Sequence, residues 1–194
     1  AGSYQKDLVK YFDGSINFSE WDEVYFLVPD TTPHNLLAYG PAITNPMYTS
    51  DGGFTNGASG GSDMYLAGNS GVVGSDWKWL AHETGHTMGF FDEDYKHTKT
   101  TLGNWSIMAM NWSNTGLEVG AWDRYIKGWI SDTQVDCQTS SQLSSTPHQT
   151  TLAPLESQDN KLKALMVPIS DTKILVVESR KNLGFDHLSS ANEG

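Results

Sequence analysis

The chain has 194 residues, of which 38% are hydrophobic and 11% aromatic, enough for one domain of ordinary size plus a small appendage. Its formal net charge of −11 argues against nucleic acid and anionic membranes as partners, and no apolar run approaches the ~18 residues of a membrane span. The single cysteine, Cys137, excludes an intrachain disulfide and a cysteine-based zinc cluster. These properties fit a secreted protein, for which calcium is a candidate ligand that acidity alone does not establish.

Two regular elements are predicted near the N-terminus. Residues 4–12 mix apolar and charged side chains at a spacing that suits a short amphipathic helix, and residues 13–15, Asp-Gly-Ser, break it. Val24 to Val28 is an almost continuous apolar run with β-branched and aromatic members, and Pro29 ends it. This run is typical of a buried central strand.

Residues 31–74 are rich in Gly, Ser, Thr, Asn and Pro, so we expect a long irregular region there. Within it, Ser62 to Gly68 is the candidate for an edge strand that binds a peptide as an added strand. Asp51 and Asp63 lie among glycines and could hold calcium, but their spacing matches no EF-hand loop. Solvated turns are the alternative interpretation of this region.

A helix is predicted from Asp76 to about Met88, with Ser75 as its N-cap and the acidic Asp76 in its first turn. The positions at helical spacing that should face the core are Trp77, Leu80, Ala81, Thr84 and Met88. His82 and His86 then fall on a neighbouring face, toward a cleft.

The stretch HETGHTMGFFD has the pattern of a metal site. His82 and His86 are four residues apart on one face of the helix, so both imidazoles can bind one metal ion. Glu83 lies beside them, where it can act as the base for a water that the metal activates. Gly89 permits a turn with positive φ, after which Asp92 can return as the third ligand. Three protein ligands leave a fourth position for water, as in catalytic zinc sites.

Chance rarely produces this pattern. HExxH alone would arise in about one chain of this composition in 140, and with Gly89 and Asp92 in about one in 20,000. The alternatives are a core helix with two satisfied histidines, or another third ligand. Asp94 and His97 follow closely, and Glu118 is the later glutamate that a different zincin arrangement would use. Asp92 is preferred because Gly89 lies midway in the turn that leads to it.

Further elements are predicted beyond the motif. Residues 104–112 have the composition of a short buried strand or turn around Ile107 and Met108. Gly120 to Ile130 is predicted to be an amphipathic helix. Its apolar face is formed by Trp122, Tyr125, Ile126 and Trp129.

The composition changes after this helix. Residues 131–149 are rich in Ser, Thr and Gln, and three apolar runs follow that should form antiparallel strands, the last two joined by a turn at Ser170 and Asp171. We therefore divide the chain into a catalytic domain, a linker or long loop, and an antiparallel β segment that could be truncated: residues 1–135, 136–149 and 150–194.

The motif HETGHTMGFFD, with WSIMAMN downstream, resembles the metzincin zinc peptidases, which share a histidine-rich zinc signature, a bend at glycine and a methionine-containing turn below the metal. More narrowly, these motifs together with GAWDRYIKGWI and ILVVESRKNLGFDH resemble the immune inhibitor A-like peptidases, which are secreted bacterial metalloproteases. The likeness covers about residues 20–30 and 75–187.

The resemblance implies an α+β fold, in which a metzincin-like domain combines a twisted mixed sheet, an active-site helix and a C-terminal helix, followed by a few antiparallel strands. It makes His82, His86 and Asp92 the zinc ligands, Glu83 the catalytic base and Met108 the Met-turn methionine. The implied function is that of a secreted, extracellular, monomeric zinc endopeptidase acting on proteins or peptides. The alternative is a non-catalytic secreted binding or adhesion module with a relic zinc site, against which the intact Glu83 argues.

Overall fold

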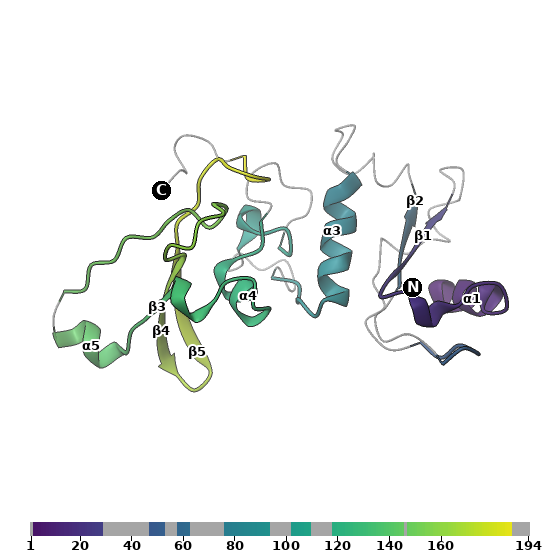
Figure 1. The fold of residues 1–194 in the computed structure, drawn as a ribbon, viewed down its shortest axis with the longest axis horizontal. Coiled ribbons are helices and arrows are strands. Elements are labelled where there is room, and N and C mark those ends of the chain that lie inside the picture. The colour runs from purple at the N-terminus through teal and green to yellow at the C-terminus, as the bar shows by residue number, and fades with distance from the viewer. Residues whose placement is uncertain are drawn as a thin grey trace. The chain divides into compact units, whose positions relative to one another are not determined.

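The computed structural model describes these residues of the chain: 2–28, 47–52, 58–62, 76–93, 102–109, 118–145 and 147–187. The chain divides into two compact units, the first made of residues 1–103 and 107–113, and the second of residues 104–106 and 114–194. Both units combine helices with strands, so the chain is of mixed helix and sheet, as the α+β class predicts (Figure 1). Each of the described helices is too short or too polar to cross a membrane.

The first unit begins with helix α1, Gly2–Phe12, which confirms the predicted N-terminal helix. Its buried Val9 packs in a small core with Phe18 and Met47, and Phe18 opens a 3-10 helix, η1, Phe18–Glu20. Three half-buried side chains complete this core: Phe12, Val24 and Phe26. The core therefore joins α1 to the first strand.

Strand β1, Val24–Val28, confirms the strand predicted there, and it pairs in parallel with β2, Ala58–Ser62. In the described part of the chain the two form a two-stranded sheet. The predicted edge strand at residues 62–68 overlaps β2 only at Ser62, and its remainder lies outside the described residues.

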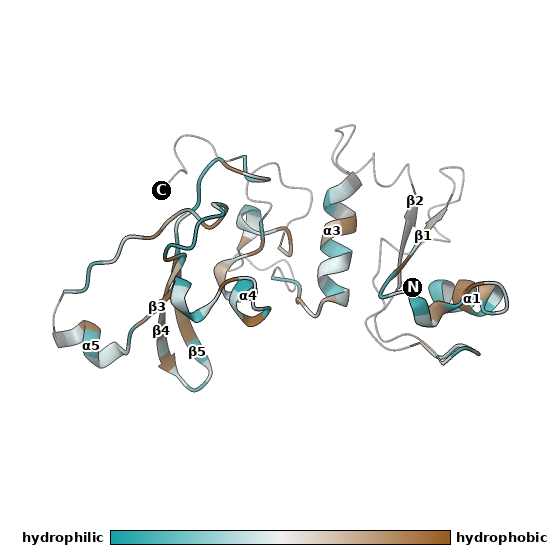
Figure 2. Ribbon diagram, in the orientation of Figure 1, coloured by the Kyte–Doolittle hydropathy of each residue, from teal (hydrophilic) through white to brown (hydrophobic). Residues whose placement is uncertain are grey.

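Helix α3, Asp76–Thr87, has the predicted span, but its buried face differs from the prediction. The residues expected to face the core are half-buried or exposed: Trp77, Leu80, Ala81, Thr84 and Met88. Among the residues of α3 whose burial is described, the buried ones are polar or small: Lys78, His82, Glu83 and Gly85. In Figure 2, α3 is accordingly coloured mainly teal and white, with brown in only one part of the helix. The apolar spacing was a poor guide because the buried side chains of this helix include the polar Lys78, His82 and Glu83.

The second unit contains a three-stranded sheet of β3, β4 and β5, in that order: Val135–Cys137, Ala164–Ser170 and Lys173–Glu178. The pair β4–β5 is the predicted antiparallel hairpin, with its turn at Asp171 and Thr172, but β3 is parallel to β4. Strand β3 lies ahead of residues 150–194, where antiparallel strands were predicted, so it is a parallel neighbour that the sequence did not predict. One core lies between this sheet and α4, Ala121–Ile126, and its buried members are Ala121, Ile130, Leu155, Ala164 and Met166.

Two further expectations for this unit need correction. The predicted linker at residues 136–149 contains the end of β3 and helix α5, Ser140–Ser145. Thr139 caps α5 because its hydroxyl accepts the N–H of Gln142 while the Gln142 side chain accepts the N–H of Thr139. The predicted strand at residues 150–156 is irregular, with a single bridge between Pro154 and Ser179.

Helix α4 is shorter than predicted and turns a different side inward. Ala121 at its start and Ile130 beyond its end are buried, whereas Trp122, Ile126 and Trp129 are about half exposed. The predicted apolar face is therefore wrong, apart from Tyr125, which packs partly against the core. The helix ends at Ile126, so Trp129 no longer lies on the predicted stripe.

Candidate metal centre

Helix α3 places two imidazoles side by side. His82 and His86 lie one turn apart, and their rings meet edge to face with centroids 4.7 Å apart. Their Nε2 atoms are 3.1 Å from each other. The helical spacing alone produces this pairing, since positions i and i+4 share one face.

The chain then reverses at the glycine that the motif predicted. Gly89 has φ of 89°, in the left-handed region, which confirms the expected turn. The N–H of Gly89 donates to the carbonyl of His86, and the N–H of Phe90 donates to the carbonyl of Gly85, both at 2.9 Å. These bonds end α3 and direct the following residues back along it.

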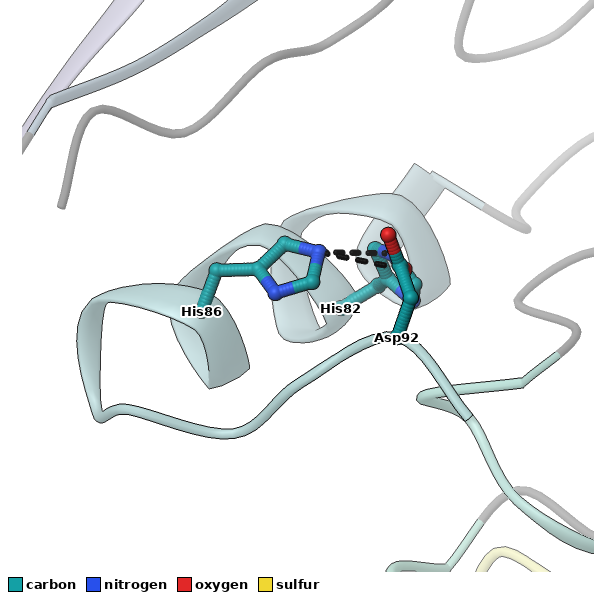
Figure 3. A group of neighbouring side chains, drawn as sticks. All are labelled: His82, His86 and Asp92. Atoms are coloured by element: carbon teal, nitrogen blue, oxygen red, sulfur yellow. Dashed lines mark hydrogen bonds and ion pairs between the residues drawn. The ribbon is translucent and has the colours of Figure 1, made fainter. Parts of the chain in front are cut away.

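The reversed segment carries Asp92 to the two imidazoles (Figure 3). Its Oδ1 lies 3.3 Å from Nε2 of His82 and 3.4 Å from Nε2 of His86. The structure thus brings together the three residues proposed as ligands, and they are the one group of this kind in the described part of the chain. The rivals Asp94 and His97 lie outside the described residues.

The opposite nitrogen of each ring is held by the backbone. Nδ1 of His82 donates to the carbonyl of Ile107 at 2.7 Å, and Nδ1 of His86 donates to the carbonyl of Phe90 at 3.0 Å. With the ring proton placed on Nδ1, the neutral imidazoles present their Nε2 lone pairs to Asp92 and to each other. This is the tautomer that a metal ligand needs, fixed by partners behind the ligands.

The spacing of the three donor atoms can be tested against a metal ion. Tetrahedral zinc with ligand bonds of about 2.0–2.2 Å holds neighbouring donor atoms roughly 3.3–3.6 Å apart. The three separations here are 3.1, 3.3 and 3.4 Å. Two imidazole nitrogens and one carboxylate oxygen also form a common donor set for zinc. The residues therefore fit a single small divalent ion.

The electrostatic environment favours neutral imidazole at His82. Burial lowers the pKa of His82, and a positive charge on His86 would lower it further, whereas the Ile107 carbonyl and Asp92 raise it. Burial is the largest of these effects. The Asp92 side chain is 53% exposed, so the centre is open to solvent on that side.

Glu83 and Met108 occupy buried positions next to the ligands. Glu83 follows His82 on α3 and is buried. Met108 is fully buried in a turn at residues 107–109, and its carbonyl accepts the N–H of Glu93 at 3.1 Å. This turn therefore supplies the Ile107 carbonyl to His82 and anchors the segment that carries Asp92.

Gly85 allows this turn to approach the helix. A Cβ atom added at Gly85 would overlap the sulfur of Met108 and come within 3.0 Å of its terminal methyl. Sequence reasoning did not single out Gly85, although a glycine inside a helix, which costs about 1 kcal/mol relative to alanine, is itself a signal of close packing. The sequence also did not predict the roles of the Ile107 and Phe90 carbonyls, because a backbone acceptor leaves no pattern in the side chains.

The alternative ligand Glu118 contacts other residues of its own unit. It belongs to the second unit, where it forms an ion pair with Arg124 and accepts the N–H of Phe185. Its carboxylate therefore has structural partners of its own.

Comparisons of the chain with protein families, with curated proteins and with solved structures found no match. The functional argument therefore rests on the residues and on their geometry.

Proposed function

We propose that this protein is a secreted zinc-dependent endopeptidase of the metzincin type, similar to the immune inhibitor A-like peptidases. One observation carries the proposal: the Nε2 atoms of His82 and His86 and Oδ1 of Asp92 converge at separations between 3.1 and 3.4 Å. The resemblance of the surrounding motifs adds the reaction type, the peptide substrates and the location outside the cell.

The close approach of these three donor atoms is favourable only if a cation lies between them. Two imidazole lone pairs and a carboxylate oxygen repel one another at these distances unless a proton or a metal lies between them. Burial lowers the pKa of His82, which disfavours a proton there near neutral pH. A divalent metal ion bound by all three donor atoms relieves the repulsion, because its coordinate bonds offset the cost of burying its charge.

The donor set favours zinc among the common ions. Calcium and magnesium bind mainly oxygen and take six or more ligands, whereas His82, His86 and Asp92 offer two nitrogens and one oxygen. Three protein ligands around an ion of tetrahedral preference leave one position for water or substrate. This arrangement supports a catalytic zinc site over a closed structural one.

When bound, zinc would lower the pKa of a water molecule toward ~7 and polarise a peptide carbonyl. Glu83 is the general base, whose carboxylate accepts the proton of the attacking water and passes it to the leaving amine nitrogen. The protein forms no covalent bond with the substrate. The carbonyls of Ile107 and Phe90 keep both imidazoles in the ligating tautomer, and Met108 supports the turn behind them.

The first test measures metal content. After incubation with zinc and gel filtration, we expect about one zinc per chain in the wild type and substoichiometric zinc in His86→Ala and Asp92→Ala. His148→Ala is the matched control, because His148 pairs with Asp136 in the second unit. Zinc retained equally by all four proteins would overturn the metal assignment.

The second test measures cleavage of casein with and without a chelator. Cleavage by the wild type should stop with the chelator and fall by about 10²–10⁴-fold in Glu83→Gln, the range for loss of a general base. The variant should keep its zinc. If the wild type binds zinc but cleaves neither casein nor a diverse peptide library, the protein is the non-catalytic binding module instead.

A further inference from the structure

The second unit contains a buried cluster of charges around Arg180. Its guanidinium lies between three carboxylates, with Nε 2.7 Å from Oε1 of Glu156, Nη1 2.8 Å from Oε1 of Glu178, and Nη2 2.7 Å from Oδ2 of Asp186. The Arg180 side chain is 5% exposed, and those of Glu156 and Asp186 are 0% exposed. Fully ionised, these four groups would place an uncompensated negative charge in the interior.

The Nε–H donor of Arg180 cannot satisfy both of the carboxylate oxygens that lie near it. The single N–H on Nε of Arg180 donates to Oδ2 of Asp186 at 2.8 Å. Oε1 of Glu156 lies near the same nitrogen, yet it receives no hydrogen bond there. Oε1 of Glu156 and Oδ2 of Asp186 therefore lie against the same nitrogen atom, at 2.7 and 2.8 Å, which places the two carboxyl groups side by side. A proton on Glu156, donated to Asp186, satisfies both oxygens and halves the excess charge.

The cluster fastens backbone segments that are distant in sequence. Oδ1 of Asp186 accepts the N–H of Glu118 at 3.0 Å, and Oε2 of Glu156 accepts the N–H of Lys181 at 3.1 Å. Oε2 of Glu178 accepts the N–H of Ala121 at 2.6 Å, at the start of α4. The segments held together are therefore the start of α4, the end of β5 and the turn before Asp186.

Other charged groups also face the cluster from the neighbouring elements. Glu118 accepts the N–H of Phe185 and pairs with Arg124 of α4. Lys163 contacts the carbonyls on either side of Glu156, those of Pro154 and Ser157. Both Arg124 and Lys163 have partners of their own, so neither cation neutralises the pair of Glu156 and Asp186.

We propose that the cluster is a pH-sensitive contact between two segments of the chain. One proton shared by Glu156 and Asp186 holds the segment from Arg180 to Asp186 against the start of α4, and loss of this proton loosens the segment. The assignment is independent of the metal centre, because all the groups belong to the second unit. It gives this unit a conformational response to pH.

The direction of the response follows from the shift at Glu156. Burial, and then the hydrogen bond with Asp186, raise the pKa of Glu156 to about 7 from its usual 4.5. A carboxyl group whose pKa is raised on folding stabilises the fold fully below its unfolded value and loses this effect as pH rises to the folded value. The segment from Arg180 to Asp186 is therefore held against α4 near pH 5 and loosened above about pH 7.

Hydrogen exchange of the whole protein tests the proposal. After correction for intrinsic exchange, peptides that contain the N–H groups of Glu118, Lys181 and Phe185 should lose about tenfold protection between pH 5.5 and 8. In Glu156→Gln the neutral amide can donate to Asp186 at every pH, so this loss should disappear. Asp171→Asn, an exposed carboxylate in the β4–β5 turn, is the matched control and should behave like the wild type.

A flat wild-type profile, or the same loss of protection in Glu156→Gln, would overturn the proposal. Carboxyl ¹³C NMR of the unmodified protein gives a second measurement that does not require the variant to fold. One glutamate should titrate near pH 7, and its transition should coincide with the loss of protection. If every glutamate titrates below about pH 5.5, the shared proton does not exist.

Discussion

The two histidines of the centre are oriented by backbone carbonyls that come from different parts of the chain. Phe90 belongs to the turn after α3, whereas Ile107 lies 25 residues beyond His82. Each carbonyl fixes one tautomer and leaves one Nε2 lone pair for the proposed metal ion. The convergence of His82, His86 and Asp92 could be predicted from their types and spacing, but these acceptors could not, because every residue carries the same carbonyl.

At the residue scale, Gly85→Ala should destabilise the first unit although alanine favours helix more than glycine by about 1 kcal/mol. The new methyl group would overlap the Met108 sulfur, and overpacking of this kind costs typically about 1–3 kcal/mol. The expected net effect is a lower midpoint of urea unfolding and weaker zinc binding, because the Met108 turn also carries the Ile107 carbonyl.

Gly14→Ala is the matched control, since a Cβ at Gly14 meets nothing within 4 Å. Combining Gly85→Ala with Met108→Ala should recover part of the loss, because truncation of the methionine removes the overlap. If Gly85→Ala proves neutral or stabilising alone and additive with Met108→Ala, the two residues do not interact as described.

At the scale of elements, the turn between α3 and Asp92 is the feature on which the centre depends. Gly89 adopts φ of 89°, which an alanine adopts only with strain of about 1 kcal/mol or more. Gly89→Ala should therefore lower stability modestly and weaken zinc binding more strongly, because a shifted turn moves Asp92 relative to both imidazoles. Competition with a fluorescent zinc chelator would measure the affinity.

Gly52→Ala is the control that distinguishes the effect of backbone strain from the effect of moving Asp92. Gly52 also has positive φ, 111°, and a Cβ there meets nothing within 4 Å, but it lies outside the ligand segment. It should lower stability by a similar amount and leave zinc affinity unchanged. Equal losses of affinity in both variants would mean that the turn at Gly89 has no particular role in placing Asp92.

Local patterns predicted several elements and failed where tertiary pairing decides the structure. The ranges of α1, β1 and α3 and the β4–β5 turn follow from apolar spacing, proline and turn residues. Strand β3 did not follow, because three residues become a strand only through their parallel partner β4. The inward face of α3 was mispredicted because its polar residues are buried at the centre.

At the scale of the whole molecule, the two proposals predict that the two units respond to different ligands. The proposed zinc ligands all belong to the first unit, and the Arg180 cluster belongs to the second. A ligand that binds only the folded state stabilises it by about 2.7 kcal/mol at a free concentration of 100 times Kd. Zinc should therefore stabilise the first unit, whereas a proton should stabilise the second.

Hydrogen exchange read unit by unit should show this separation. Zinc at pH 6 should increase protection in peptides from α3 and residues 107–109 and leave those from β4 and β5 unchanged. Lowering the pH from 8 to 5.5 without zinc should increase protection in the second unit. In His86→Ala the response to zinc should vanish while the response to pH persists. If zinc protects both units equally, they unfold as one cooperative structure, and metal binding then governs the stability of the entire chain.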